Sequence, residues 1–177
     1  DEGALDRAVY FANVLGVDTG MFYKRRDYSK IVNGKNPIVA HEFLGDNIDG
    51  KDVIIMDDMI ASGGSMIDTA KQLKAMNAKR VYLCATFGLF TEGLSKFDEA
   101  YEKCYFDKIV TTNLTYQIPE LKSRPYYVEA DMSKMIASIV DFMNHDSSMS
   151  NVYTSAEKIH EILERYNSRE DFIENDP

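Results

Sequence analysis

The chain has 177 residues, enough for one domain of ordinary size with its own hydrophobic core. Its formal net charge of -9 and pI of about 4.8 argue against a binder of nucleic acid or of anionic membranes, since either needs a basic face. No apolar run approaches the roughly 20 residues that a membrane span requires, and no secretory signal is visible.

Two cysteines, Cys84 and Cys104, are too few for a disulfide scaffold, which favours a reduced, cytoplasmic protein. The three histidines, His41, His145 and His160, show no metal-ligand spacing with either cysteine. We therefore expect no zinc site.

Hydrophobic periodicity predicts strands and helices that alternate along the chain. Helices are expected over 4–15, 65–77, 94–104, 131–144 and 155–166, and strands over 21–24, 37–44, 53–56, 80–87, 107–112 and 126–129. Gly16 is a candidate cap for the first helix, and the polar residues 25–36 predict a long loop. This order predicts a doubly wound α/β domain, with a mostly parallel sheet and helices on both faces. We expect residues 1–146 to form that domain, and residues 147–177 to form a helical extension with an acidic tail.

The stretch VIIMDDMIASGGS, residues 53–65, places two adjacent carboxylates, Asp57 and Asp58, at the predicted carboxyl end of a buried strand. Ligands of open parallel sheets bind at this edge. A short loop follows, rich in glycine and hydroxyl groups, and it leads into a helix; its residues are Ala61, Ser62, Gly63, Gly64 and Ser65. Loop amides and a helix N-terminus favour an anion, and serine hydroxyls add donors.

The two halves of this stretch suit different parts of one ligand. The carboxylates of Asp57 and Asp58 would repel a phosphate, but they can accept hydrogen bonds from a vicinal diol or hold a divalent cation. A ribose with a 5-phosphate satisfies both halves, with the phosphate in the loop and the diol at the aspartates. The alternative is purely structural, a capped turn between a strand and a helix.

A basic segment interrupts the acidic chain. It carries five cations against Asp27, namely Lys24, Arg25, Arg26, Lys30 and Lys35. A solvated loop is the simple explanation. Beside a phosphate site, such cations would also stabilise charge on a transferred phosphoryl group.

The stretch over residues 53–65 resembles the phosphoribosyl-diphosphate (PRPP) binding motif of the type I phosphoribosyltransferase fold. Further segments resemble one branch, the ribose-phosphate pyrophosphokinases: DEGALDRA at residues 1–8, YKRR at 23–26 and AKRVYLCATFGLFTEG at 78–93. The resemblance extends over about residues 1–139. It implies transfer of diphosphate from ATP to the 1-hydroxyl of ribose 5-phosphate, making PRPP for nucleotide biosynthesis.

The resemblance also implies roles for individual residues. It makes Lys24 and Arg26 the catalytic cations on a mobile loop, and it assigns Asp1 to magnesium, although Asp1 also suits an N-cap of the first helix. Asp57, Asp58 and the loop from Ala61 to Ser65 would bind ribose 5-phosphate. Mg2+ as cofactor, ATP as co-substrate and assembly into homo-oligomers are further expectations.

The chain also departs from the family pattern. Many relatives carry aspartate at the position of Ala61, a second glycine at Ala4 and aspartate at Asn113, and His-Pro is common where Phe87 and Gly88 stand. Nothing here corresponds to the family's N-terminal half, so we expect a C-terminal part of a longer enzyme that is inactive alone. The alternatives are a phosphoribosyltransferase that consumes PRPP, and a non-catalytic regulatory subunit resembling PRPP synthetase.

Overall fold

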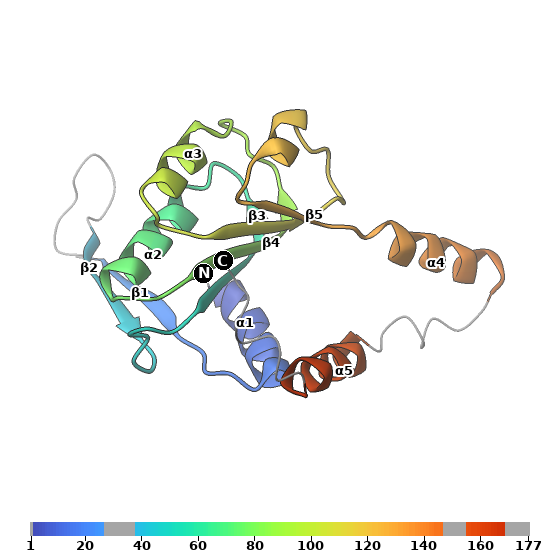
Figure 1. Cartoon of the computed structure of the whole chain (residues 1–177), viewed down its shortest axis with the longest axis horizontal. Coiled ribbons are helices and arrows are strands. Elements are labelled where there is room, and N and C mark those ends of the chain that lie inside the picture. The colour runs from blue at the N-terminus through green and yellow to red at the C-terminus, as the bar shows by residue number, and fades with distance from the viewer. Residues whose placement is uncertain (1, 27–37, 147–154, 169–177) are drawn as a thin grey trace.

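The structure is a computed structural model that describes residues 2–26, 38–146 and 155–168 (Figure 1). Its helices are α1 (Glu2–Leu15), α2 (Gly64–Ala75), α3 (Ser95–Glu102), α4 (Ser133–Asn144) and α5 (Ser155–Asn167), with one 3-10 turn, η1 (Pro119–Ser123). Its strands are β1 (Met21–Arg26), β2 (Ile38–Leu44), β3 (Val53–Ile60), β4 (Val81–Gly88), β5 (Lys108–Thr112) and β6 (Tyr127–Ala130).

Four of the strands form one parallel sheet in the order β3-β4-β5-β6. This arrangement confirms the predicted α/β class. The other two strands, β1 and β2, pair with each other as an antiparallel hairpin, which the sequence pattern did not predict. The hairpin also takes Arg25 and Arg26 into β1, although we expected a loop to begin there.

One face of the sheet is closed by α2 and α3 and holds the hydrophobic core (Figure 1). In β4, Val81, Leu83 and Ala85 are buried, whereas Tyr82 and Cys84 between them are only half-buried. Alternate residues of a strand face opposite sides, so the first three side chains face α2 and α3. Those helices contribute the buried residues Met66, Ala70, Leu73, Phe97 and Ala100.

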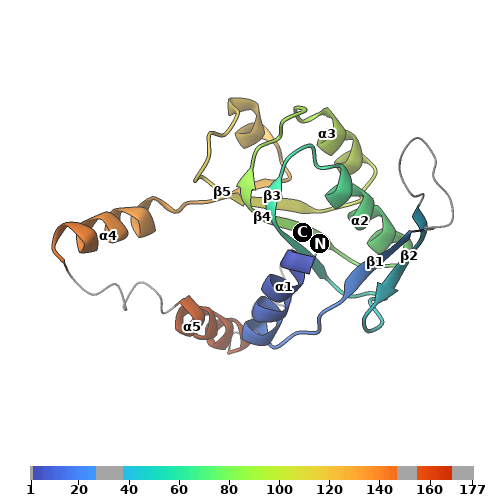
Figure 2. The same ribbon diagram turned by 180° about the vertical axis from the view of Figure 1, so that it is seen from behind.

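The opposite face is covered only in part. Helix α1 contacts β3 and α5 contacts α1, while α4 extends away from the sheet (Figures 1 and 2). Ile54 of β3 is 51% exposed and Val128 of β6 is 42% exposed; on α4, Val140 reaches 59% and Met143 69%. Helices flank both faces, as predicted, but they cover the two faces unequally.

A polar cluster ties α3 to the segment before β6. The guanidinium of Arg124 donates to both carboxylate oxygens of Asp98, at 2.8 and 2.9 Å, and the hydroxyl of the buried Tyr126 donates to Asp98 at 2.7 Å. Partial burial disfavours the charged carboxylate, but the hydrogen bonds from Arg124 and Tyr126 outweigh it and lower the pKa of Asp98. We name Asp98, Arg124 and Tyr126 the α3 staple.

The C-terminal end of α1 follows the prediction. Gly16 has a φ of 67°, and the amide of Val17 donates to the carbonyl of Ala12 at 3.0 Å. This is the left-handed helix ending that glycine allows at least cost. Thr154 precedes α5 and is a candidate N-cap by residue type, but it lies outside the described residues.

Candidate functional site

The paired aspartates lie within β3 and not after it. We predicted that the strand ends at Met56, but β3 continues to Ile60, because it keeps parallel pairing with β4 as far as Gly88. Asp57 is half-buried, and Asp58 is exposed. The backbone amide of Asp58 donates to Oδ1 of Asp57 at 2.8 Å, which fixes the direction of the Asp57 carboxylate.

The surroundings of Asp57 shift its pKa. Partial burial raises the pKa of Asp57, and the neighbouring Asp58 side chain raises it further, although the amide hydrogen bond from Asp58 acts in the opposite direction. A carboxylate with a raised pKa gains stabilisation from a nearby cation or from hydroxyl donors. A cation or a hydroxyl donor beside Asp57 would therefore favour its charged form.

The segment after β3 begins helix α2 without a side-chain cap. Gly63 is the N-cap residue, and the first turn of α2 contains no acidic residue. The first amide with an intrahelical acceptor is that of Ile67, which donates to the carbonyl of Gly63 at 2.9 Å. Within the described part of the chain, the amides that open α2 at Gly64 have no side-chain acceptor, so they are available to an anion.

The two glycines of this loop serve different purposes. Gly63 has a φ of 78°, and a Cβ there would lie 2.0 Å from Cζ of Phe97, so the fold itself requires glycine. Gly64 has no such reason, because a Cβ there would meet only the hydroxyl of Ser62, at 4.0 Å. The missing side chain of Gly64 thus leaves open space at the first residue of α2.

The loop is anchored at its base to the segment after β4. The amide of Leu89 donates to the carbonyl of Ile60 at 2.8 Å, and the amide of Thr91 donates to that of Ala61 at 3.0 Å. Ser65 is exposed and Ser62 is half-buried. The structure thus places the acidic strand end and the anion-accepting helix start in one continuous segment at the carboxyl edge of the sheet.

The structure describes only some of the cations that the sequence analysis assigned to the site. Lys24 pairs with His41 in the β1–β2 hairpin, and Arg26 pairs with Ile38 across an irregular register. Figure 1 shows this hairpin beside the C-terminal end of α2, away from the loop that opens the helix. Residues 27–37, with Lys30 and Lys35, and Asp1, the predicted magnesium ligand, lie outside the described residues.

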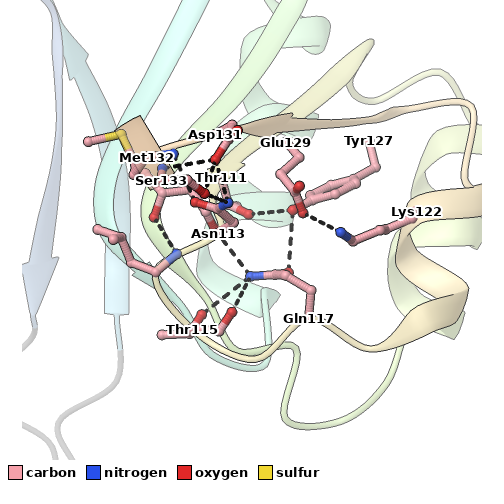
Figure 3. Close-up of polar contacts among 12 residues, drawn as sticks. Thr111, Asn113, Thr115, Gln117, Lys122, Tyr127, Glu129, Asp131, Met132 and Ser133 are labelled. Carbon is pink, nitrogen blue, oxygen red and sulfur yellow. Dashed lines mark hydrogen bonds and ion pairs between the residues drawn. The ribbon is translucent and has the colours of Figure 1, made fainter. Parts of the chain in front are cut away.

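A polar network that the sequence reasoning missed occupies the carboxyl ends of β5 and β6 (Figure 3). The hydroxyl of Tyr127 lies 2.9 Å from that of Thr111 and donates to Oε1 of Gln117 at 3.3 Å. The amide group of Gln117 donates to the carbonyl of Thr112 at 3.2 Å, and Lys122 pairs with Glu129 at 2.9 Å. The signal in the sequence was the polar run TTNLTYQ after the apolar strand.

Within this network, Asn113 fixes where α4 begins. Its amide group donates to Oδ1 of Asp131 at 2.7 Å, and its carbonyl accepts the backbone amide of Met132 at 2.9 Å. Oδ1 of Asp131 also accepts the amide and the hydroxyl of Ser133, at 2.9 and 2.6 Å. Asn113, one of the departures from the family pattern, therefore holds the ends of β5 and β6 together (Figure 3).

The described residues offer little to a metal ion on their own. They bring no three histidine, cysteine, aspartate or glutamate side chains together. Cys84 is half-buried, and burial raises its pKa to about 11, so it stays a thiol.

Among the described residues, no helix has both the length and the apolar character that a bilayer crossing demands.

A parallel sheet whose acidic strand leads into an uncapped, glycine-containing helix start defines an α/β domain with unpaired amides at the carboxyl edge of its sheet. Comparison with known proteins narrows this class. The model of the phosphoribosyl synthetase-associated domain matches residues 26–154, and the chain belongs to that family.

Curated relatives carry the name ribose-phosphate pyrophosphokinase. The chain is 40% identical over 93 residues to that of Thermococcus kodakarensis, which is 52% of this chain and 31% of the relative. It is 30% identical over 157 residues to that of Mycoplasma pneumoniae, which is 87% of this chain and 45% of the relative. The chain thus spans less than half the length of these relatives, in their C-terminal part.

A solved structure shows the same fold. The crystal structure of phosphoribosylpyrophosphate synthetase from Mycobacterium smegmatis superimposes with a TM-score of 0.66 at 21% sequence identity. The match covers 82% of this chain and 43% of that chain. It supports the α/β fold of the chain.

Proposed function

We propose that this domain is the ribose 5-phosphate-binding part of a ribose-phosphate diphosphokinase. The reaction transfers the diphosphoryl group of ATP to the 1-hydroxyl of ribose 5-phosphate, which yields PRPP and AMP for nucleotide biosynthesis. The observation that carries the proposal is the uncapped start of α2, with open space at Gly64, close in sequence to Asp57 and Asp58.

The ligand would lie along this segment. The 5-phosphate accepts hydrogen bonds from the amides and hydroxyls of the residues 61–65, where the helix N-terminus favours negative charge. The ribose diol donates to Asp57 and Asp58, which belong to β3 and precede the loop that would hold the phosphate. One ligand would therefore supply hydrogen-bond donors to Asp57 and Asp58 and an acceptor to the unpaired amides at the start of α2.

Magnesium suits this site. Mg2+ prefers carboxylate and phosphate oxygens and keeps several waters, so one or two aspartates suffice on the protein side. When bound, it neutralises negative charge on the diphosphate. Asp57 and Asp58 would hold it together with the substrate oxygens, and Asp1 is a further candidate ligand.

In the transfer itself, the oxygen of the ribose 1-hydroxyl bonds to the β-phosphorus of ATP, the bond from that phosphorus to the AMP oxygen breaks, and the hydroxyl proton is released. Lys24 and Arg26 would stabilise charge on the moving group. This role requires strand β1, which carries both residues, to approach the Ala61–Ser65 loop.

The wider setting follows from the relatives. Their name, ribose-phosphate pyrophosphokinase, supports ATP as co-substrate, and their length supports action of this domain within a longer chain. We also propose that the enzyme containing this domain is cytoplasmic and forms homo-oligomers.

The test compares two product assays on the longest natural chain that carries this domain. The proposal expects AMP and PRPP from ATP and ribose 5-phosphate, and no release of diphosphate from PRPP with nucleobases. Release of diphosphate would establish a phosphoribosyltransferase instead. Binding of ribose 5-phosphate without either turnover would establish a non-catalytic subunit.

A variant pair tests the cations. Lys24→Ala should lower turnover by about two orders of magnitude, since loss of one preorganised charge stabiliser has that effect elsewhere. Lys30→Ala, a cation of the same basic segment with no assigned role, serves as the control. Equal turnover in the two variants would remove Lys24 from the mechanism.

A further inference from the structure

We propose that Phe90 and Phe97 are positioning residues that hold the α2 amides in place for the phosphate, an inference that rests on the proposed function. Neither ring faces the ligand side of the loop, because Phe97 is 0% and Phe90 4% exposed. They act through the backbone of Gly63 and through the segment after β4.

The ring of Phe97 lies directly against the loop backbone. A Cβ on Gly63 would lie 2.0 Å from Cζ and 2.6 Å from Cε1 of Phe97, so only glycine lets the loop approach the ring so closely. Gly63 is the N-cap residue of α2. The position of the Phe97 ring therefore limits how far the start of α2 can move toward the core.

Phe90 holds the Phe97 ring from the other side. The two rings meet edge to face, with centroids 5.1 Å apart and an interplanar angle of 73°. A Cβ on Gly88 would lie 2.6 Å from the ring of Phe90. The ring can therefore occupy this position only because residue 88 is a glycine. The aromatic pair fills the space between the end of β4, α3 and the start of α2.

The backbone of Phe90 is strained, with a φ of 46°. A bulky residue seldom adopts this left-handed conformation, and such strain persists only when the surroundings impose it. Here the amide of Phe90 donates to the carbonyl of Ile60 at 3.3 Å, and the amide of Gly93 donates to that of Phe90 at 2.9 Å. The strained residue thus lies where the segment after β4 hydrogen-bonds to the base of the loop from Ala61 to Ser65.

The competing explanation is that both rings only fill the core. Phe106 allows the two to be separated. It is 1% exposed, stacks edge to face on Tyr126 at 5.4 Å, and lies just before β5, at the amino edge of the sheet. Phe106→Leu removes the same atoms as Phe97→Leu from the same core, but it does so far from the loop.

The experiment titrates ribose 5-phosphate into the 177-residue chain and into both variants, and it measures 15N relaxation of the amides from Gly63 to Met66. We expect Phe97→Leu to weaken binding about tenfold and to lower the order parameters of these amides, since small misplacements of positioning groups are costly. Phe106→Leu should change affinity less than about twofold at a similar loss of stability. If Phe97→Leu proves unfolded, Phe97→Met, which keeps most of the volume, replaces it.

Equal affinities in the two variants, with unchanged relaxation of the loop, would overturn the positioning role. A wild-type chain that fails to bind ribose 5-phosphate would instead defeat the proposed function. The relaxation data then decide the positioning role alone: lower order parameters at Gly63–Met66 in Phe97→Leu but not in Phe106→Leu uphold it, and equal values in both reject it.

Discussion

The two faces of the parallel sheet are built differently. On the face under α2 and α3, Leu83 and Ile109 are 0% exposed, and two aromatic rings fix the start of α2. On the other face, Ile54 is 51% exposed, and α4 extends away from the sheet beyond its first residues (Figure 1). The covered face packs Phe97 against the start of α2, whereas the other face contributes apolar surface that is exposed to solvent.

The largest contrast should come from deleting a side chain on each face. Leu83→Ala should lower the free energy of unfolding by about 3–4 kcal/mol, because it leaves a cavity in the closed core. Ile54→Ala should cost less than about 1 kcal/mol, because half of that side chain is already in water. Urea denaturation measures both, and similar losses would show that the open face is covered in solution.

The glycines of the loop should separate folding from binding. Gly63→Ala should cost about 2–3 kcal/mol, because it combines a left-handed backbone with a clash against Phe97. Gly64→Ala should change stability by less than about 1 kcal/mol, yet weaken ribose 5-phosphate binding by placing a methyl group before the amides. Calorimetric titration of the two variants checks this, and unaltered affinity in Gly64→Ala would contradict the proposed seat of the phosphate.

The α3 staple should contribute less to stability than Leu83 or Gly63. Asp98→Ala should cost about 1–2 kcal/mol, since it leaves Arg124 and the hydroxyl of the buried Tyr126 without their acceptor. Tyr126→Phe, which removes the donor together with its demand for a partner, should cost about half as much. The midpoints of thermal unfolding rank the two variants, and the reverse order would rule out this account of the cluster.

The smallest effect concerns pH, and it has opposite signs at the two aspartates. The pKa of Asp57 is raised above its ordinary value of 3.8, so the folded chain holds this proton longer, and stability falls as the pH rises from 3.8 through the raised pKa. The pKa of Asp98 is lowered, so its contribution is present above 3.8 and is lost as the pH falls through the lowered pKa.

Urea midpoints between pH 3 and pH 6, measured for Asp57→Asn and Asp98→Asn, test these signs. Asp57→Asn should remove a decrease of stability with rising pH, and Asp98→Asn should remove an increase. Since the proposed site uses Asp57 as a carboxylate, the affinity for ribose 5-phosphate should rise more steeply with pH in the wild type than in Asp57→Asn.

Local patterns in the sequence predicted much of this fold. Helical spacing identified the five helices of the described residues, with Gly16 ending the first as expected, and the four parallel strands were also expected, β3 from a continuous apolar run. The β1–β2 pairing was missed because Arg25 and Arg26 carry no strand pattern. The end of β3 was misplaced because polarity suggested a loop, whereas hydrogen bonds to β4 continue the strand through Asp57 and Asp58.

The candidate site was predictable only where its parts are neighbours in the sequence. Asp57, Asp58 and the loop that follows lie within one short stretch, so their chemistry is visible without a structure. The separate duties of Gly63 and Gly64 were not visible, because they depend on Phe97, which is distant along the chain. The same holds for the Asn113–Asp131 bond, which joins the ends of two strands.

That bond makes the orientation of α4 a property of strand β5. Asn113, at the end of β5, hydrogen-bonds to the residues that lead into α4. These bonds connect the start of the helix directly to the sheet (Figure 3). A displacement of α4 would therefore be transmitted to the carboxyl edge of the sheet. The loop from Ala61 to Ser65 follows β3 at the same edge.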